Sequence, residues 1–304
     1  MKVVISGASG LIGSALVKDL RKDGHDVVRL VRREPAEADE ARWDPHGTVD
    51  AKALEGCDAV VHLAGAGVGD RPWTEAYKEK IRDSRLSGTR ALAEALAGLD
   101  ARPRVLVSGS AIGYYGDTGG REVDEDSPAG EGFLADLVRD WEPAAAPAAE
   151  AGIRVVHPRT GIVLAGDGGQ LGRTLPLFKL GLGGRLGDGT QWVSWISITD
   201  HIAALRYLID HDELSGPVNL TAPAPVTNAV FTKAVGQALG RPTLLSVPKF
   251  ALRLALRDFA DEGPLVSQRV LPRRLEGAGF EFAHPDVNAA VRAAVRAAVR
   301  AEHA

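Results

Sequence analysis

The stretch KVVISGASGLIG at residues 2–13 decides the fold of this chain. Its apolar run, VVI, is typical of a strand that is buried on both faces. Gly7, Gly10 and Gly13 follow at GxxGxxG spacing, and residues 11–20 continue with the periodicity of a helix. A strand, a glycine turn and a helix in this order bind the pyrophosphate of a dinucleotide, because the turn lets the backbone approach the phosphates and the helix N-terminus offers free N–H groups. The stretch therefore predicts a nucleotide site.

Strand and helix signals alternate along the first half of the chain, which predicts an α/β fold with a doubly wound parallel sheet. The polar segment at residues 35–50 is expected to be a loop. Proline residues at 143 and 147 must break or bend the last helix of this half. Further strands are predicted at residues 26–31, 58–63, 104–108 and 153–156, and helices at residues 11–22, 73–99 and 133–151.

The sequence changes character after Gly161, where glycine-rich segments and short strands begin. A length of 304 residues allows one large α/β domain or a nucleotide domain with a smaller second one. We place the nucleotide domain at residues 1–161, with its sheet completed by strands from residues 190–222. Residues 162–304 form a smaller C-terminal α/β region for substrate or interaction. Its last helix, at residues 285–302, has valine at every fourth position and is predicted to dock by one face.

The end of the second predicted strand distinguishes two cofactors. Folds that bind NAD place a carboxylate about 20 residues after the glycine turn to hold the ribose 2′-hydroxyl, whereas folds that bind NADP place arginine there for the 2′-phosphate. This chain has Arg32 and Arg33 at that distance. The two arginines favour NADP(H). The alternative is two solvated arginines at a strand end, and the neighbouring Glu34 keeps that alternative open.

Two further strand ends are candidates for ligand contact, because ligands of open parallel sheets bind at the carboxyl ends of the strands. Ala64 and Gly65 follow the third predicted strand, where small residues let the adenosine half of the cofactor pack against backbone. Ser108 ends the fourth strand, and Ser110 lies in the loop beyond it. Tyr114 and Tyr115 come next, either as site residues or as packed rings.

Composition excludes several other classes of protein. A formal net charge of -4 with mixed signs argues against nucleic-acid binding, and no segment reaches about 18 uninterrupted apolar residues. The single cysteine, Cys57, suits a reducing compartment, and the chain begins in its first strand, which leaves no room for a signal peptide. Histidine and cysteine spacings predict no metal site. We expect a cytoplasmic protein without a nucleic-acid or membrane partner.

The accumulated motifs resemble an extended short-chain dehydrogenase/reductase of the atypical branch called the epimerase family. The stretches that carry the likeness are SGASGLIG at 6–13, VRR at 31–33, HLAGAGVGDRPWTEAYKEKIRDSRLSGT at 62–89, SGSAIGYYGD at 108–117, EDSPAGEGF at 125–133, PRTGIVL at 158–164, LGLGGRLGDGTQWVSWISITD at 180–200, GPVNLTAPAPVTNAVF at 216–231 and SQRVLPRRLEGAGFEF at 267–282. The last two resemble the C-terminal domain of unknown function of that branch.

The resemblance implies an NADP-binding Rossmann domain and assigns positions within it. Arg32 corresponds to the 2′-phosphate position, and Leu63 with Ala64 lies beside the adenosine ribose. Arg85 and Arg159 match arginines near the cofactor, although Arg85 could instead be solvated on its helix. The positions at the pyrophosphate are Gly7, Ser9, Gly10, Leu11, Ile12 and Gly13.

The sequence departs from the dehydrogenase pattern at the catalytic pair. Short-chain dehydrogenases use Tyr-x-x-x-Lys, in which the lysine lowers the pKa of the tyrosine that moves the proton. No tyrosine of this chain has a lysine four residues later, and the expected place has Phe133 and Leu137. The usual proton-transfer pair is therefore missing. A smaller departure is Ser197, where the branch has histidine after Trp-Ile.

Two classes of function follow. The first is an NADP(H)-dependent epimerase or oxidoreductase that acts on a small carbonyl or sugar-like substrate, with Ser110 binding the carbonyl and Tyr114 or Tyr115 as acid. The second is a protein that binds NADP(H) without turning it over, as a sensor or assembly partner. A homodimer is left open as its assembly.

Overall fold

A computed structural model describes residues 1–302 of the chain and the side chains of residues 1–300. These residues form two compact units that interleave along the sequence. Unit 1 comprises residues 1–111, 137–159 and 205–218, and unit 2 comprises residues 112–136, 160–204 and those from 219 onward. The predicted division at residue 161 stays a prediction.

Unit 1 is built on a mostly parallel sheet with the strand order β13-β8-β5-β4-β1-β2-β3. Adjacent strands from β8 to β3 pair in parallel, and β1 lies between β2 and β4. Val3, Val4 and Ile5 of β1 are fully buried, which explains their unbroken apolar run. The predicted doubly wound α/β fold is confirmed. The strands are β1 (Lys2–Ser6), β2 (Asp26–Val31), β3 (Glu40–Arg42), β4 (Ala59–His62), β5 (Val105–Ser108), β8 (Arg154–Thr160) and β13 (Gly216–Leu220), with β6 (Ser110–Ala111) pairing β8.

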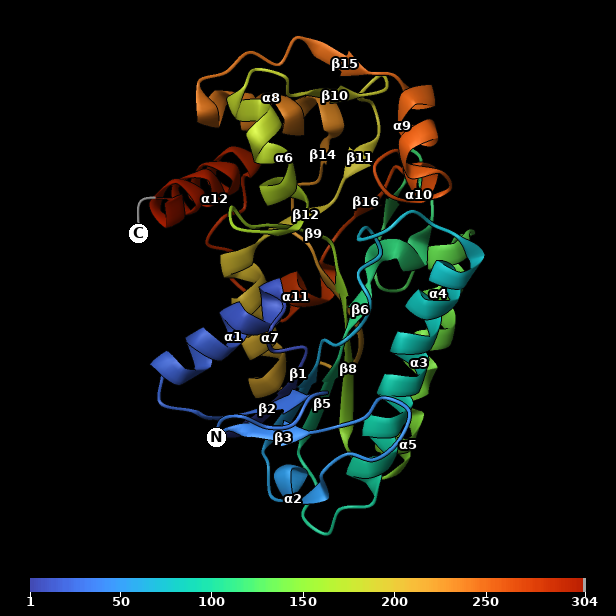
Figure 1. Cartoon of the computed structure of the whole chain (residues 1–304), viewed down its shortest axis with the longest axis vertical. Coiled ribbons are helices and arrows are strands. Elements are labelled where there is room, and N and C mark those ends of the chain that lie inside the picture. Colours follow the sequence, from blue (N-terminus) through green and yellow to red (C-terminus); the bar gives the residue numbers. More distant parts are fainter. Residues whose placement is uncertain (303–304) are drawn as a thin grey trace. The chain divides into compact units, whose positions relative to one another are not determined.

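Helices cover both faces of this sheet (Figure 1). On one face, α1 (Leu11–Lys22) is tied to α7 (Ile198–Asp210) because Arg206 donates to Asp19 at 2.8 Å. On the other face, α3 (Glu75–Ala97) and α5 (Ala146–Glu150) pack on the sheet. The core of that side joins Val4, Val60 and Leu106 of three strands to the helices, including Leu92, Leu96, Ala145 and Ala148.

Of two predictions about these elements, the break in the last helix is confirmed and the loop before residue 51 differs from the structure. The helix predicted at residues 133–151 is divided into α4 (Phe133–Trp141), the 3-10 turn η2 (Glu142–Ala145) and α5, because Pro143 and Pro147 cannot donate helical hydrogen bonds. The predicted loop at residues 35–50 contains the edge strand β3, which pairs with β2. The short helix α2 (Ala51–Leu54) follows that segment.

Unit 2 combines short two-stranded sheets with helices. Val287, Val291 and Val295 of α12 (Val287–Glu302) are buried in its core beside Leu171 and Val235, so the predicted docked helix is confirmed. The paired strands are β9 (Ile162–Leu164) with β12 (Trp195–Ser197), β10 (Gly184–Leu186) with β15 (Leu245–Val247), β11 (Trp192–Val193) with β14 (Val226–Thr227), and β7 (Glu122–Val123) with β16 (Arg269–Val270). The other elements are η1 (Ile112–Tyr115), α6 (Gly169–Lys179), α8 (Asn228–Leu239), α9 (Lys249–Leu256), α10 (Phe259–Glu262) and α11 (Arg273–Gly277).

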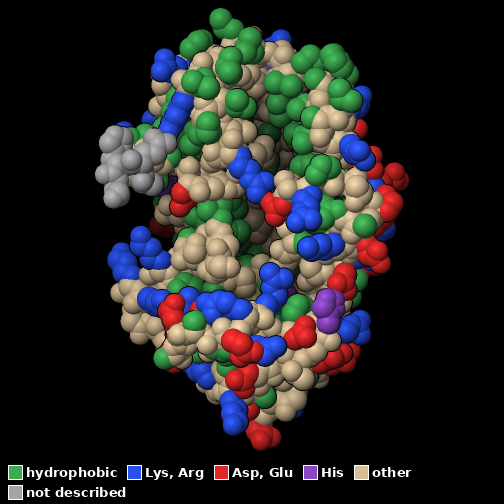
Figure 2. Space-filling model, viewed as in Figure 1, with side chains coloured by type: hydrophobic (Ala, Val, Ile, Leu, Met, Phe, Trp, Pro, Cys, Tyr) green, Lys and Arg blue, Asp and Glu red, His purple; other side chains and the backbone are tan. Residues whose placement is uncertain are grey.

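Large apolar side chains are exposed on unit 2. Figure 2 shows them gathered where β15 and α9 lie. We call this set the apolar surface of unit 2; it comprises Leu180, Leu182, Leu244, Phe250 and Leu254. Within the described residues, no helix is both long enough and apolar enough to span a membrane.

Candidate functional site

The glycine turn between β1 and α1 is closed too tightly for side chains. Gly7 has a φ of 71°, and a Cβ atom on it would lie 2.7 Å from the carbonyl carbon of Leu63. A Cβ atom on Gly13 would lie 2.2 Å from the carbonyl oxygen of Gly7. Gly10 is less restricted, because its Cβ would meet that oxygen at 3.4 Å. The spacing of the first and third glycines therefore reflects direct backbone contact.

The N-terminus of α1 is open to a ligand. Gly10 caps the helix without a side-chain hydrogen bond, and the first turn contains no acidic residue. The N–H groups of Leu11, Ile12 and Gly13 have no partner within the helix, as in any first turn. Ser9 and Gly10 are exposed beside them. The helix dipole and these N–H groups favour an anion at this place.

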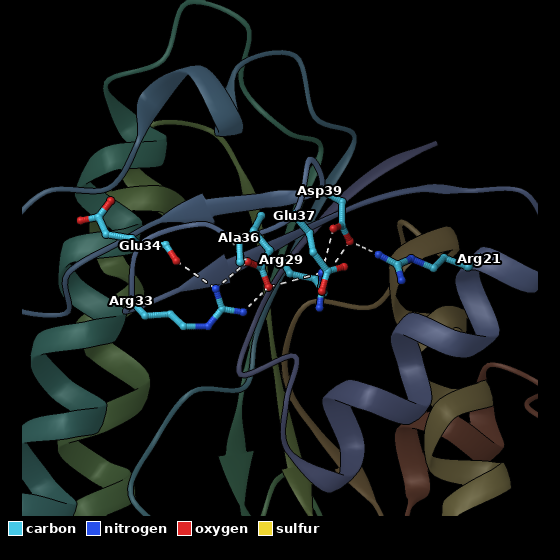
Figure 3. Close-up of polar contacts among 8 residues, drawn as sticks. Arg21, Arg29, Arg33, Glu34, Ala36, Glu37 and Asp39 are labelled. Atoms are coloured by element: carbon cyan, nitrogen blue, oxygen red, sulfur yellow. Dashed lines mark hydrogen bonds and ion pairs between the residues drawn. The ribbon is translucent and has the colours of Figure 1, made fainter.

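The two arginines that follow β2 differ in their surroundings. Arg33 donates to both carboxylate oxygens of Glu40, at 2.7 and 2.6 Å, and Glu40 also accepts the backbone N–H of Ala36 (Figure 3). These hydrogen bonds, Arg33 first, lower the pKa of Glu40 to about 2. Arg33 therefore has a protein partner already, although the sequence predicted it to contact the cofactor. Arg32 is exposed and pairs with none of the side chains that the structure describes.

Four further charged residues complete the network in Figure 3. Arg29 donates to both oxygens of Asp39, each at 2.7 Å, and to Glu37 at 2.8 Å. Arg21 of α1 also reaches Asp39. Arg29 and Arg33 both donate to carboxylates. Arg32 is therefore the arginine at this strand end that is available to pair with an anionic ligand.

A second arginine without a carboxylate lies near the end of β4. Arg85 donates to the carbonyl oxygens of Ala66 at 2.9 Å and Ile81 at 3.1 Å, and its guanidinium lies 5.0 Å from the ring centre of Trp141. Arg85 lies beside Gly65, where an added Cβ would make an ordinary contact with Arg85 Cζ at 3.4 Å. Burial lowers the pKa of Arg85 to about 10. A half-buried cation without a carboxylate partner favours an anionic ligand. Leu63 and Ala64, at the same strand end, are half-buried.

Ser110 belongs to a cluster of three side chains from separate elements of unit 1. Its hydroxyl donates to Oε1 of Glu142 at 2.7 Å. Arg159 donates to the same carboxylate, from Nε to Oε1 at 2.8 Å and from Nη2 to Oε2 at 2.9 Å. Arg159 is thus engaged by Glu142, a residue that the sequence did not single out. The Ser108 hydroxyl and His157 Nδ1 are buried and have no partner in the described part of the chain.

The tyrosines of η1 have different environments. Tyr115 is 1% exposed, and its hydroxyl donates to Oδ1 of Asn219 at 2.8 Å. Tyr114 is half-buried and meets the Tyr115 ring edge-on at 5.2 Å. Tyr115 therefore has the surroundings of a packing residue, which was the alternative to a site role. The catalytic roles of both tyrosines stay predictions. At the position of the missing pair, Leu137 is 2% exposed in the core.

Glu125 accepts a hydrogen bond from the backbone of Asn219. Its Oε1 accepts the N–H groups of Asn219 at 2.9 Å and Arg274 at 3.3 Å, whereas Oε2 is buried without a partner among the described residues. Burial is the largest influence on this carboxyl and raises its pKa. A carboxyl with a raised folded-state pKa contributes stability below its unfolded pKa, and that contribution is lost as the pH rises through the folded value.

We therefore expect Glu125→Gln to unfold at a higher temperature than the unchanged protein at about pH 8 and to lose that advantage near about pH 4, where the carboxyl is protonated. Thermal unfolding followed by circular dichroism at both pH values measures the difference. Glu131→Gln, at an exposed position, is the control and should show neither effect. Equal destabilisation of Glu125→Gln at both pH values would contradict the explanation.

Sequence reasoning missed Glu142 because its partners are distant along the chain. The available signal was the Trp-Glu-Pro break in the helix, which places Glu142 at the start of the proline-containing turn η2. No group of three or more histidine, cysteine or acidic side chains in the described part of the structure is arranged to hold a metal ion.

The fold and the site define a dinucleotide-binding protein of the Rossmann type: a mostly parallel doubly wound sheet, with a glycine turn at the end of its central strand. The chain belongs to the NAD-dependent epimerase/dehydratase family, whose pattern matches residues 3–220. Residues 247–294 match a domain of unknown function (DUF1731).

Individual relatives agree with this membership. An epimerase family protein of Mycobacterium leprae is 51% identical over 290 residues, which cover 95% of this chain and 94% of that protein. The crystal structure of human epimerase family protein SDR39U1, isoform 2, with NADPH has a TM-score of 0.90 and 34% identity, covering 97% of this chain and 99% of that chain. A nucleoside-diphosphate sugar epimerase of Corynebacterium glutamicum has a TM-score of 0.81 and 39% identity, over 97% of this chain but 58% of that chain.

Proposed function

We propose that this chain binds NADP(H) and acts as an epimerase- or oxidoreductase-like enzyme on a small carbonyl or sugar-like substrate. The observation that carries the cofactor assignment is the unpaired Arg32 at the end of β2, beside an Arg33 that is held by Glu40. The human relative solved with NADPH supports the same choice of cofactor.

The residues present fit the chemistry of this dinucleotide. The open N-terminus of α1 suits the pyrophosphate, and the Gly7 turn keeps the backbone close to it. Arg32 supplies charge for the 2′-phosphate, and Arg85 is a half-buried cation without a carboxylate partner, which an anion would pair. Bound NADP(H) would supply hydride transfer; the chain's own residues bind and orient it.

The substrate side of the proposal rests on Ser110, which follows β5 at the carboxyl edge of the sheet. Its hydroxyl is held by Glu142, so it is oriented before any ligand arrives. Tyr114, in η1 just beyond it in sequence, is the candidate acid, because it is half-buried whereas Tyr115 is 1% exposed. The absent Tyr-x-x-x-Lys pair leaves no other tyrosine at this strand end.

Arg32→Ala is expected to weaken NADPH binding about 10- to 100-fold and to leave NADH binding unchanged, since a hydrogen bond to a charged group contributes roughly 1.5–3 kcal/mol. Fluorescence titration of the reduced cofactors measures both constants. Arg90→Ala, on an exposed position of α3, is the control. Tighter or equal binding of NADH to the unchanged protein would remove the assignment of Arg32.

A second candidate function is a cofactor-binding protein without turnover, a sensor or an assembly partner. Two observations favour it: Phe133 and Leu137 replace the catalytic pair, and the apolar surface of unit 2 suits a partner, for which a second copy of this chain is the simplest proposal. A panel of carbonyl compounds and nucleotide sugars discriminates the two. Oxidation of NADPH with any of them supports the enzyme, whereas NADPH binding without any turnover supports the second candidate.

A further inference from the structure

We propose that Glu142 is a positioning residue that makes the Ser110 oxygen a hydrogen-bond acceptor, so that this position receives a hydroxyl group of the ligand rather than a carbonyl group. The inference deepens the proposed function, on which it rests, by naming the chemical group that Ser110 contacts. It assigns to Glu142 a role in ligand selection.

The direction of each hydrogen bond in the cluster is fixed by chemistry. A carboxylate only accepts, and a guanidinium only donates. Arg159 donates two hydrogen bonds to Glu142, at 2.8 and 2.9 Å, which is the bidentate arrangement of an ion pair. The remaining contact, 2.7 Å between Ser110 Oγ and Glu142 Oε1, must therefore use the serine hydrogen.

The surroundings hold this arrangement in place. Trp141, directly before Glu142, donates its indole N–H to Thr89 at 2.9 Å, and the Arg85 guanidinium stacks on its ring. On the other side, the Gly109 N–H donates to the carbonyl oxygen of His62 at 2.8 Å and fixes the backbone before Ser110. Both partners of the Ser110–Glu142 bond are thus anchored independently of any ligand.

The consequence for a ligand follows from the serine hydroxyl itself, which has one hydrogen and two lone pairs. With its hydrogen on Glu142, Ser110 presents only lone pairs. A ligand hydroxyl can donate to them, whereas a carbonyl oxygen would face them without a hydrogen between. Turning the serine hydrogen toward a carbonyl would forfeit a charge-assisted hydrogen bond, which is stronger than a neutral one. The site therefore favours an alcohol.

Matched probes test this directly: cyclohexanol and cyclohexanone, titrated into the full chain by ligand-observed NMR, with and without NADPH. Ser110→Ala should weaken binding of the alcohol about fivefold, as expected for the loss of one neutral hydrogen bond, and should leave the ketone unaffected. Glu142→Gln should reduce the preference for the alcohol, because a neutral amide oxygen holds the serine hydrogen less strongly than a carboxylate does. A structural role alone would not change the alcohol-to-ketone ratio.

Glu150→Gln, at an exposed position of α5, is the matched control and should behave like the unchanged protein. A ketone weakened as much as the alcohol by Ser110→Ala, an unchanged ratio in Glu142→Gln, or no binding of either probe to the unchanged protein would overturn the inference. The proposed function fails on a different result, namely the absence of NADPH binding. The titrations without NADPH keep the two failures apart.

Discussion

Gly13→Ala is expected to destabilise the fold by about 3 kcal/mol and to abolish measurable NADPH binding, which would be the largest effect of a single methyl group in the nucleotide site. The added Cβ would lie 2.2 Å from the carbonyl oxygen of Gly7 and 2.9 Å from Ala8 Cα. Both are backbone atoms, so no side chain can rotate away. The turn between β1 and α1 must open, and the N–H groups at the start of α1 move with it.

Thermal unfolding and fluorescence titration with NADPH measure the two parts of this effect. Gly98→Ala is the control, because a Cβ there would lie 3.6 Å from the nearest backbone oxygen, an ordinary contact, and Gly98 has a right-handed φ of -81°. We expect that variant to keep both its melting temperature and its affinity. If Gly13→Ala bound NADPH like the unchanged protein, the turn would not be the pyrophosphate site.

The glycine turn could be predicted from sequence because its causes are local. Gly7 and Gly13 contact each other across six residues, and β1 precedes them with an apolar run that is typical of a strand buried on both faces. The same holds for α12, whose valines at every fourth position follow directly from the helical period. Patterns of this kind need no knowledge of the rest of the chain.

The partners of the site residues could not be predicted, because they come from distant or weakly patterned segments. Arg32 and Arg33 are equivalent by spacing, and they are distinguished only by Glu40 in β3, whose sequence Glu-Ala-Arg has no strand signal. Tyr115 is paired with Asn219, which lies 104 residues away. Sequence spacing finds where a strand ends, and tertiary contact decides which side chain there is free.

For Ser110, too, the sequence predicts the position of the residue but not its hydrogen-bond partners. The strand signal alone predicts that Ser110 follows β5. Its hydrogen-bonding role, however, depends on Glu142 and Arg159, which lie 32 and 49 residues further along the chain. Glu142 begins η2 and accepts the Ser110 hydroxyl, and no periodic pattern marks a single carboxylate at the end of a broken helix.

Arg159→Met is expected to destabilise the protein by about 3 kcal/mol at neutral pH, the lower end of the range for breaking a buried ion pair, because the Glu142 side chain is 13% exposed. The substitution leaves Glu142 charged and largely out of water, with only Ser110 as a donor. An unpaired, desolvated carboxylate has a raised pKa in the folded protein. Stability that is present below its unfolded pKa is then lost as the pH rises through the folded value, so the deficit of the variant should grow from about pH 4 to about pH 8.

A double-mutant cycle separates this charge effect from lost packing. Glu142→Gln combined with Arg159→Met removes the stranded charge, so we expect the double variant to be more stable than Arg159→Met alone and nearly independent of pH over the same interval. Arg90→Met, on an exposed position of α3, controls for the substitution of arginine by methionine at the surface. Chemical denaturation at several pH values measures each corner. A double variant no more stable than Arg159→Met would mean that the arginine acts through its packing, and the orientation of Ser110 would then need another cause.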